Sequence, residues 1–280
     1  SSPAARALFD RLEACRSGLL DLCFNGSAEE LARTENTQPS VYAVDLAAAA
    51  ALEEAGLHAD AVAGFSLGEL AALAFAGYVT PEQGFELVQR RAALMAEAAQ
   101  RHPGAMLAVM RMENEAVESL CAGKMLYPVN YNCPGQLVVA GPKEDIEQLQ
   151  VAVKQAGGRS IPLAVSGGFH SPFMAEAAQA MGEVYEATAF GMPGITLYSN
   201  VTGRPYGQDV AALLQQQIDH PVQWEAIMRN MCASGIDCFV EAGPGKVLAG
   251  FVARTVPDAR AFSVDSFESL KKWKEERCHV

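Results

Sequence analysis

The fold of this chain is decided by the stretch Ala61-Val62-Ala63-Gly64-Phe65-Ser66-Leu67-Gly68-Glu69-Leu70. Its first three residues are apolar, as in a buried strand, and its last residues open a helix rich in small side chains. A Gly-x-Ser-x-Gly between a strand and a helix is typical of a nucleophile elbow, where a serine occupies a sharp, strained turn. We expect Gly64 and Gly68 to be small so that the strand and the helix can pass close by.

The helix expected from Leu67 onward gives Ser66 favourable electrostatic surroundings. The first N–H groups of a helix have no partner within it, and the positive end of its dipole lies there. The Leu67 N–H is therefore a natural donor to an oxyanion that develops next to the serine. The same pattern also occurs in ordinary turns that cap helices, and the strand before it favours the nucleophile.

The composition allows a sizeable folded core and argues against several classes of partner. Half of the 280 residues are apolar, which allows one large domain, or a large domain that carries a small one. The 33 acidic residues outnumber the 21 basic ones, for a net charge of -12. This balance argues against nucleic acid and against anionic membrane surfaces as partners.

The cysteines and the apolar runs indicate a soluble, cytoplasmic protein. The seven cysteines are scattered and include no Cys-x-x-Cys pair, so we expect reduced thiols and no metal site. The first residues have no signal-peptide pattern. The longest apolar run, residues 46–52, is too short to cross a bilayer.

The middle of the chain predicts a separate small subdomain. Strands are expected at 105–109, 126–130, 136–140 and 159–164, and helices at 113–121 and 143–156. The order β-α-β-β-α-β is the ferredoxin-like pattern. We therefore expect a small subdomain over 103–166, inserted in a large α/β subdomain formed by 1–102 and 167–280.

One arginine is expected on the apolar face of a helix. Thr80-Pro81-Glu82-Gln83 is a strong helix start, and the inward face of that helix carries Leu87, Val88, Leu94 and Met95. Arg91 falls within this face, whereas Arg90 points elsewhere. A buried guanidinium needs an anion, which is either a structural carboxylate or the carboxylate or phosphate of a ligand.

A serine nucleophile needs a base, and five histidines are available: His58, His102, His170, His220 and His279. His170 is the best candidate because it follows a glycine pair at a domain junction, where clefts form. One ring nitrogen would accept the Ser66 proton, and the other needs an orienting acceptor. No Asp or Glu is indicated by motif, which leaves a backbone carbonyl.

Several ordered motifs together resemble the malonyl-CoA:acyl carrier protein transacylases and the acyltransferase domains of polyketide synthases. The resemblance covers nearly the whole chain. It rests on Thr37-Gln38-Pro39, Gly64-Phe65-Ser66-Leu67-Gly68-Glu69, Gln89-Arg90-Arg91-Ala92, Val129-Asn130-Tyr131-Asn132-Cys133-Pro134-Gly135-Gln136, Gly168-Phe169-His170-Ser171, Pro221-Val222-Gln223-Trp224 and Glu241-Ala242-Gly243-Pro244-Gly245-Lys246.

The resemblance implies a role for each matching residue. The expected catalytic set is Ser66 as acylated nucleophile, His170 as general base, Leu67 as oxyanion N–H donor and Gln217 as the residue whose backbone carbonyl orients the histidine. The expected substrate-binding set is Arg91 on the malonyl carboxylate, together with Phe169, Asn132 and Gln38.

The resemblance also implies a fold and a reaction. The fold is an α/β-hydrolase-like core with a mostly parallel sheet, and the reaction is ping-pong transfer of the malonyl group from malonyl-CoA to the phosphopantetheine thiol of holo-acyl carrier protein. Malonyl-CoA is a substrate, and no bound cofactor is expected. The chain departs from the family at Phe65, where histidine is usual, and it starts after the strand and glutamine loop that supply the second oxyanion donor.

Two alternatives stay open at this point. The first is a serine esterase or thioesterase of the α/β-hydrolase type, although that fold places its histidine near the C-terminus. The second is a non-catalytic module that binds carrier protein. Phe65 and the missing first strand are the observations that suggest this alternative.

Overall fold

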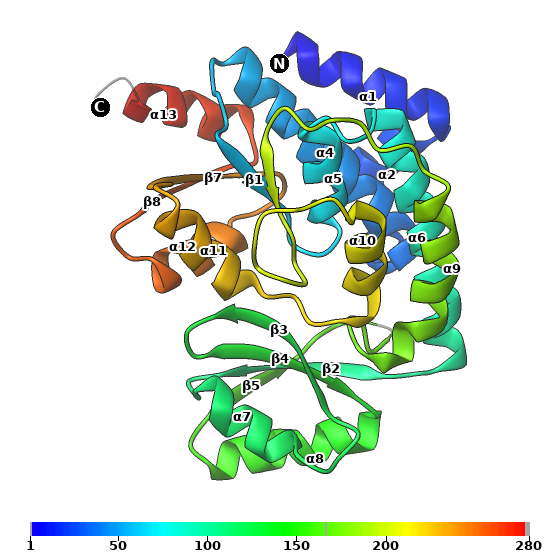
Figure 1. The fold of residues 1–280 in the computed structure, drawn as a ribbon, viewed down its shortest axis with the longest axis vertical. Coiled ribbons are helices and arrows are strands. Elements are labelled where there is room, and N and C mark those ends of the chain that lie inside the picture. Colours follow the sequence, from blue (N-terminus) through cyan, green and yellow to red (C-terminus); the bar gives the residue numbers. More distant parts are fainter. Residues whose placement is uncertain (1, 166, 278–280) are drawn as a thin grey trace. The chain divides into compact units, whose positions relative to one another are not determined.

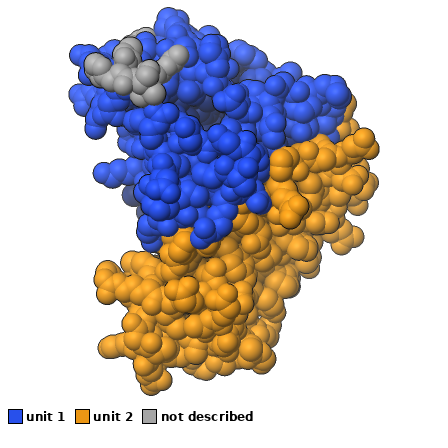
Figure 2. Space-filling model, turned by 60° about the vertical axis from the view of Figure 1, so that its left-hand side comes forward, with its two compact units in different colours: residues 1–89, 190–198, 228–280 blue, residues 90–189, 199–227 orange. Residues whose placement is uncertain are grey.

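The computed structural model describes residues 2–165 and 167–277, and within it the chain forms two compact units (Figures 1 and 2). Unit 1 comprises 1–89, 190–198 and 228–280, and unit 2 comprises 90–189 and 199–227. His279 lies outside the described residues. The division into subdomains 1–102 with 167–280 and 103–166 stays a prediction.

Unit 1 is built from helices around short parallel strands. Its helices are α1 (Pro3–Cys15), α2 (Leu19–Asn25), α3 (Ala28–Ala32), α4 (Thr34–Glu54), α5 (Gly68–Phe75), α12 (Val247–Thr255) and α13 (Phe267–Arg277). Strand β1 (Ala61–Ala63) pairs in parallel with β6 (Thr196–Tyr198). Strand β7 (Cys238–Ala242) pairs in parallel with β8 (Arg260–Val264). Helix α6 (Pro81–Arg101) begins in this unit and ends in unit 2, and α11 (Trp224–Ala233) does the reverse.

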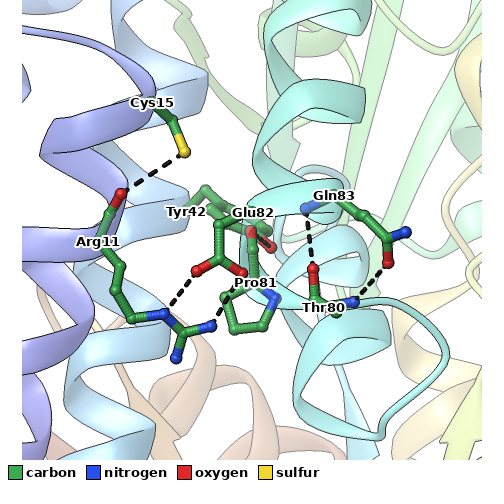
Figure 3. A network of polar contacts seen from close by, with 7 residues as sticks. All are labelled: Arg11, Cys15, Tyr42, Thr80, Pro81, Glu82 and Gln83. Atoms are coloured by element: carbon green, nitrogen blue, oxygen red, sulfur yellow. Dashed lines mark hydrogen bonds and ion pairs between the residues drawn. The ribbon is translucent and has the colours of Figure 1, made fainter.

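The start of α6 is capped as its sequence predicts, and it is tied to two other helices (Figure 3). The Thr80 N–H donates to Gln83 Oε1 at 3.0 Å, and the Gln83 N–H donates to Thr80 Oγ1 at 3.2 Å. On α1, Arg11 Nη2 donates to Glu82 Oε2 at 2.8 Å. From α4, the buried Tyr42 hydroxyl donates to the Pro81 carbonyl at 2.9 Å. These contacts fix the beginning of the helix that carries Arg91.

Unit 2 contains an antiparallel sheet of four strands with helices beside it. Its elements are β2 (Ala105–Met110), α7 (Asn114–Cys121), β3 (Tyr127–Cys133), β4 (Gln136–Gly141), α8 (Lys143–Gln155), β5 (Arg159–Pro162), the 3-10 turn η1 (Pro172–Met174), α9 (Ala175–Glu186) and α10 (Val210–Asp219). The strand order is β3-β4-β2-β5, and every neighbouring pair is antiparallel. The predicted strands and helices of residues 105–164 are all present.

The two faces of this sheet carry different cores because successive side chains of a strand alternate. Leu107 and Val109 face the apolar residues of α7 and α8. Met106 and Ala108 lie on the opposite face, where the half-buried Phe169 packs against them. The residue before His170 is therefore anchored on the second face of the sheet.

The C-terminal helix is more deeply packed than its sequence indicates. Its charged tail, from Lys271 onward, predicts a solvated amphipathic end. In the structure, Leu270 and Trp273 are buried against Leu52 and Val264. Because the two apolar residues are three apart, they share one face of α13, and the lysines and glutamates cover the other.

We expect Trp273→Ala to lower the free energy of unfolding by about 3–5 kcal/mol, because it removes a large buried side chain. Lys272→Ala is the matched control, since the Lys272 side chain is 74% exposed. Urea unfolding followed by circular dichroism measures both. Equal stability of the two variants would contradict the packing of α13.

Candidate active site

Ser66 occupies the strained turn that the sequence predicts. It follows β1 and precedes α5, and its φ is 51°. Among the described residues, the only other non-glycine residues with positive φ are Arg111 and His170. Such a conformation is unfavourable by about 1–3 kcal/mol and is concentrated at functional sites. Two of the three strained residues are the predicted nucleophile and its predicted base.

Gly64 is the glycine on which this turn depends. A Cβ at Gly64 would lie 1.9 Å from the backbone C and O of Gly68, a distance that no side chain tolerates. A Cβ at Gly68 would lie 3.9 Å from Asp45 Oδ2, which is an ordinary van der Waals contact. Within unit 1 the steric requirement therefore falls on Gly64, and the expectation that both glycines must be small is correct for only one of them.

Leu67, for which the sequence predicts an oxyanion role, caps the start of α5 next to Ser66. In the turn, the Gly68 N–H donates to the Phe65 carbonyl at 2.9 Å, and the Glu69 N–H donates to the Ser66 carbonyl at 3.1 Å. Leu67 has helical φ and ψ at the cap of α5, and its N–H donates no hydrogen bond to any described residue. This donor therefore remains available beside Ser66.

Gly64→Ala is expected to lower the melting temperature sharply, because the new methyl group overlaps the backbone of α5. Gly68→Ala should melt within a few degrees of the wild-type chain, since its Cβ meets no close atom of unit 1. Thermal unfolding by calorimetry compares the two. A Gly64→Ala variant as stable as Gly68→Ala would rule out the close approach of strand and helix.

His170 is buried in unit 2 and is oriented by a backbone carbonyl. Its side chain is 4% exposed, and its Nδ1 lies 2.8 Å from the carbonyl oxygen of Gln217 on α10. A carbonyl can only accept, so Nδ1 carries the hydrogen and the other nitrogen, Nε2, is the basic one. The contact is the one that the family resemblance predicts for Gln217.

The glycine pair before His170 is closely packed against neighbouring side chains. A Cβ at Gly167 would lie 2.7 Å from the Cβ of Ala99 on α6, and one at Gly168 would lie 2.4 Å from the ring of Phe173. Ser171 Oγ donates to the Gly168 carbonyl at 2.5 Å and accepts from the Phe173 N–H at 3.3 Å. The segment can therefore hold His170 at its strained φ of 61°.

Arg91 is buried on α6 as its helical periodicity predicts. Its side chain is 1% exposed, whereas the adjacent Arg90 is exposed. Within unit 2, Arg91 Nη2 donates to Gln217 Oε1 at 2.9 Å. This partner is an uncharged amide oxygen, so the bond itself does not neutralise the guanidinium.

The neighbourhood of His170 keeps its ring neutral. Burial and, second, the positive charge of Arg91 lower the pKa of His170 to about 4, although the backbone hydrogen bonds to Gln217 and His220 act in the opposite direction. A neutral imidazole at pH 7 is the state that a general base requires. Because the unfolded chain binds this proton below about pH 6.5, His170 makes folding less favourable as the pH falls from about 6.5 towards 4.

We expect the ring resonances of His170 to titrate well below pH 6.5 in the wild-type chain. Arg91→Met should raise the pKa of His170, because it removes the second cause of the shift. Arg90→Met is the matched control and should leave this pKa unchanged. Histidine NMR across the pH range measures the pKa of His170 in the wild-type chain and in both variants. An unchanged pKa in Arg91→Met would contradict an electrostatic effect of Arg91 on His170.

The other two residues predicted to bind substrate, Gln38 and Asn132, belong to different units. Gln38 is buried on α4 in unit 1 and donates to Thr34 Oγ1 at 2.8 Å. Asn132 is buried on β3 in unit 2, and its Oδ1 has no hydrogen-bond partner among the described residues. Asn130 on the same strand has the same property, and sequence reasoning missed it. The sequence could have indicated Asn130, because an amide side chain is unusual at a buried position of a strand.

Neither a metal site nor a transmembrane helix is found in the part of the chain that the structure describes. No group of His, Cys, Asp and Glu residues in 2–165 and 167–277 could hold a metal ion. No helix of these residues has the length and apolar character needed to cross a membrane. Cys15, Cys23, Cys121, Cys133, Cys232 and Cys238 are free thiols.

Known proteins similar to this chain are acyltransferases. The chain matches the acyl transferase domain family over residues 1–277. It is 34% identical to the malonyl CoA-acyl carrier protein transacylase of Bacillus subtilis (strain 168) over 278 residues, covering 96% of this chain and 88% of that protein. The chain belongs to the malonyl-CoA:acyl carrier protein transacylase family. It is an acyltransferase, as the resemblance predicts.

Solved transacylases have the same α/β fold. The malonyl CoA-acyl carrier protein transacylase of Clostridium perfringens Atcc 13124 superimposes with a TM-score of 0.94 at 31% identity, covering 99% of this chain and 90% of that one. A chain from a complex of a type II PKS acyl-carrier protein with its malonyl-transacylase gives a TM-score of 0.92 at 34% identity. The match covers 98% of this chain and 92% of that one. The predicted α/β class is confirmed.

Proposed function

We propose that this transacylase moves the malonyl group of malonyl-CoA to the phosphopantetheine thiol of acyl carrier protein through an ester on Ser66. The observation that carries the proposal is the buried set formed by Arg91, Gln217 and His170. One residue, Gln217, binds both a neutral imidazole and a guanidinium. A base and a carboxylate receptor held together in this way suit a substrate that has a reactive thioester and a free carboxylate.

The first half-reaction loads the enzyme. Ser66 Oγ attacks the thioester carbonyl, and its proton passes to Nε2 of His170. The Leu67 N–H stabilises the oxyanion of the tetrahedral intermediate. The intermediate collapses, the carbon–sulfur bond breaks, and the leaving CoA sulfur takes the proton from His170. The product is free CoA and malonate esterified on Ser66.

The second half-reaction unloads it. The phosphopantetheine thiol of holo-acyl carrier protein gives its proton to Nε2 of His170, and the thiolate attacks the ester carbonyl. When this intermediate collapses, Ser66 recovers the proton from His170. The Gln217 carbonyl keeps Nδ1 protonated throughout, so the same nitrogen, Nε2, takes part in both steps.

Arg91 is proposed to hold the free malonyl carboxylate. A buried guanidinium favours an anion strongly, because its charge has lost most of its hydration. Phe169, Asn132 and Gln38 are proposed to line the site, and the buried Oδ1 of Asn132 is an acceptor for a substrate N–H or O–H group. Phe65 stands where the family usually has histidine, so the proposed mechanism uses no ring donor there.

The finer fold description is also proposed. The strand order β3-β4-β2-β5 and the β-α-β-β-α-β sequence support a ferredoxin-like subdomain over 103–166. The parallel pairs β1–β6 and β7–β8 support an α/β-hydrolase-like core formed by 1–102 and 167–280. The free thiols support a cytoplasmic location, and the acidic composition argues against nucleic acid and anionic membrane surfaces as partners. The proposed reaction uses malonyl-CoA as a substrate and no bound cofactor.

The nucleophile is tested by intact mass after incubation with malonyl-CoA. We expect the wild-type chain to gain one malonyl group and Ser66→Ala to gain none, because the ester oxygen is missing. Ser119→Ala, at an exposed position of α7, is the matched control and should be acylated normally. Full acylation of Ser66→Ala would show that Ser66 is not the nucleophile.

The carboxylate receptor is tested by substrate preference. Arg91→Ala should lose malonyl loading while acetyl loading persists, since only malonate has the free carboxylate. Arg90→Ala, one residue away on the same helix and exposed, should keep the wild-type preference. Loading rates from malonyl-CoA and acetyl-CoA give the ratio. An equal fall for both acyl groups in Arg91→Ala would rule out the carboxylate role.

A further inference from the structure

We infer that the side-chain amide of Gln217 is a positioning group that orients Arg91 for the substrate carboxylate and so sets the preference for malonyl over acetyl groups. This role is separate from that of the Gln217 backbone carbonyl, which contacts His170. The inference rests on the proposed function, because it assigns a selective role to the same site.

The contacts divide Gln217 into two independent parts. Its carbonyl oxygen lies 2.8 Å from His170 Nδ1, and its side-chain Oε1 accepts from Arg91 Nη2 at 2.9 Å. The residue is 1% exposed. A substitution that leaves α10 intact keeps the first contact, because every residue has a backbone carbonyl, whereas it changes the second. The two functions can therefore be separated by changing one side chain.

The chain around Gln217 is fixed well enough to act as a support. Leu214 and Ile218 of α10 are buried, and a Cβ at Gly182 of α9 would lie 2.6 Å from Cδ of Gln215, so the two helices are in close contact. Past the end of α10, the Val222 N–H donates to the Val129 carbonyl of β3 at 2.8 Å. Both ends of this segment are thus anchored within unit 2.

An amide side chain suits this role. Its oxygen accepts one guanidinium hydrogen bond and so restrains the position of the group, yet it adds no negative charge. Gln217 therefore does not neutralise the positive charge of Arg91, and a carboxylate binds a guanidinium bidentately only when that group is correctly oriented. A glutamate at the same position would form a buried ion pair with Arg91 and compete with the substrate.

Two variants of Gln217 and one control test the inference. Gln217→Glu places a competing carboxylate on Arg91, and Gln217→Met keeps a long unbranched side chain but removes the acceptor. Gln216→Glu makes the same chemical change at the adjacent, exposed position of α10. For each chain, the rates of malonyl and acetyl loading of Ser66 are measured by intact mass, and the pKa of His170 is measured by NMR.

We expect Gln217→Glu to lower the malonyl-to-acetyl ratio of loading rates by about tenfold or more, the scale of a lost hydrogen bond to a charged group. Gln217→Met should lower the ratio in the same direction by a smaller factor. Gln217→Glu should also raise the pKa of His170, because a new negative charge offsets Arg91, whereas a merely structural substitution would leave this pKa unmoved. Gln216→Glu should match the wild-type chain in all three measurements.

The outcomes separate this inference from the function on which it rests. Equal losses of malonyl and acetyl loading in both Gln217 variants would overturn the positioning role and leave the acyltransferase function intact. If Gln217→Glu does not fold, an unchanged ratio in folded Gln217→Met would overturn the role by itself. If neither malonyl-CoA nor acetyl-CoA acylates the wild-type chain, the proposed function is contradicted, and this inference is contradicted with it.

Discussion

The chemistry assigned to this chain depends on one buried arrangement in unit 2, in which Gln217 contacts a positive guanidinium and a neutral imidazole. Burial of the imidazole and, second, the positive charge of the Arg91 cation disfavour the protonated ring and lower the pKa of His170 to about 4. The same cation is a strong receptor for a carboxylate. In the proposed function, the malonyl carboxylate binds to Arg91, and its negative charge would offset the cation and increase the basicity of His170. Substrate recognition and base strength would then be coupled through electrostatics.

The proposed nucleophile in unit 1 and the proposed base in unit 2 both have a strained backbone conformation. Ser66 has a φ of 51° and His170 a φ of 61°, and each is held there by glycines whose Cβ positions are filled by neighbouring atoms. In unit 1 the close approach of Gly64 to α5 forces the turn. In unit 2 the glycine pair before His170 packs against α6 and Phe173. Close packing supplies the free energy that keeps both side chains in conformations they would not adopt alone.

Local sequence patterns predicted the parts of this structure that depend on near neighbours. The elbow, the capped start of α6, the burial of Arg91 and the β-α-β-β-α-β order all follow from short-range periodicity and turn chemistry. What the residues alone did not predict is long-range. The contact between Arg91 and Gln217 joins residues 126 apart, and no spacing rule indicates it. Trp273 was missed because the charges around it outweighed two apolar residues in a short helix.

The central claim is that one acyl group is esterified on Ser66 while its free carboxylate binds Arg91. A crystal structure of the chain after brief exposure to malonyl-CoA tests it most directly. We expect electron density continuous with Ser66 Oγ and a malonyl carboxylate within hydrogen-bond distance, about 3 Å, of the Arg91 guanidinium, with the Arg91 to Gln217 bond retained. An acyl group on another residue, or an ester on Ser66 whose carboxylate points away from Arg91, would contradict it.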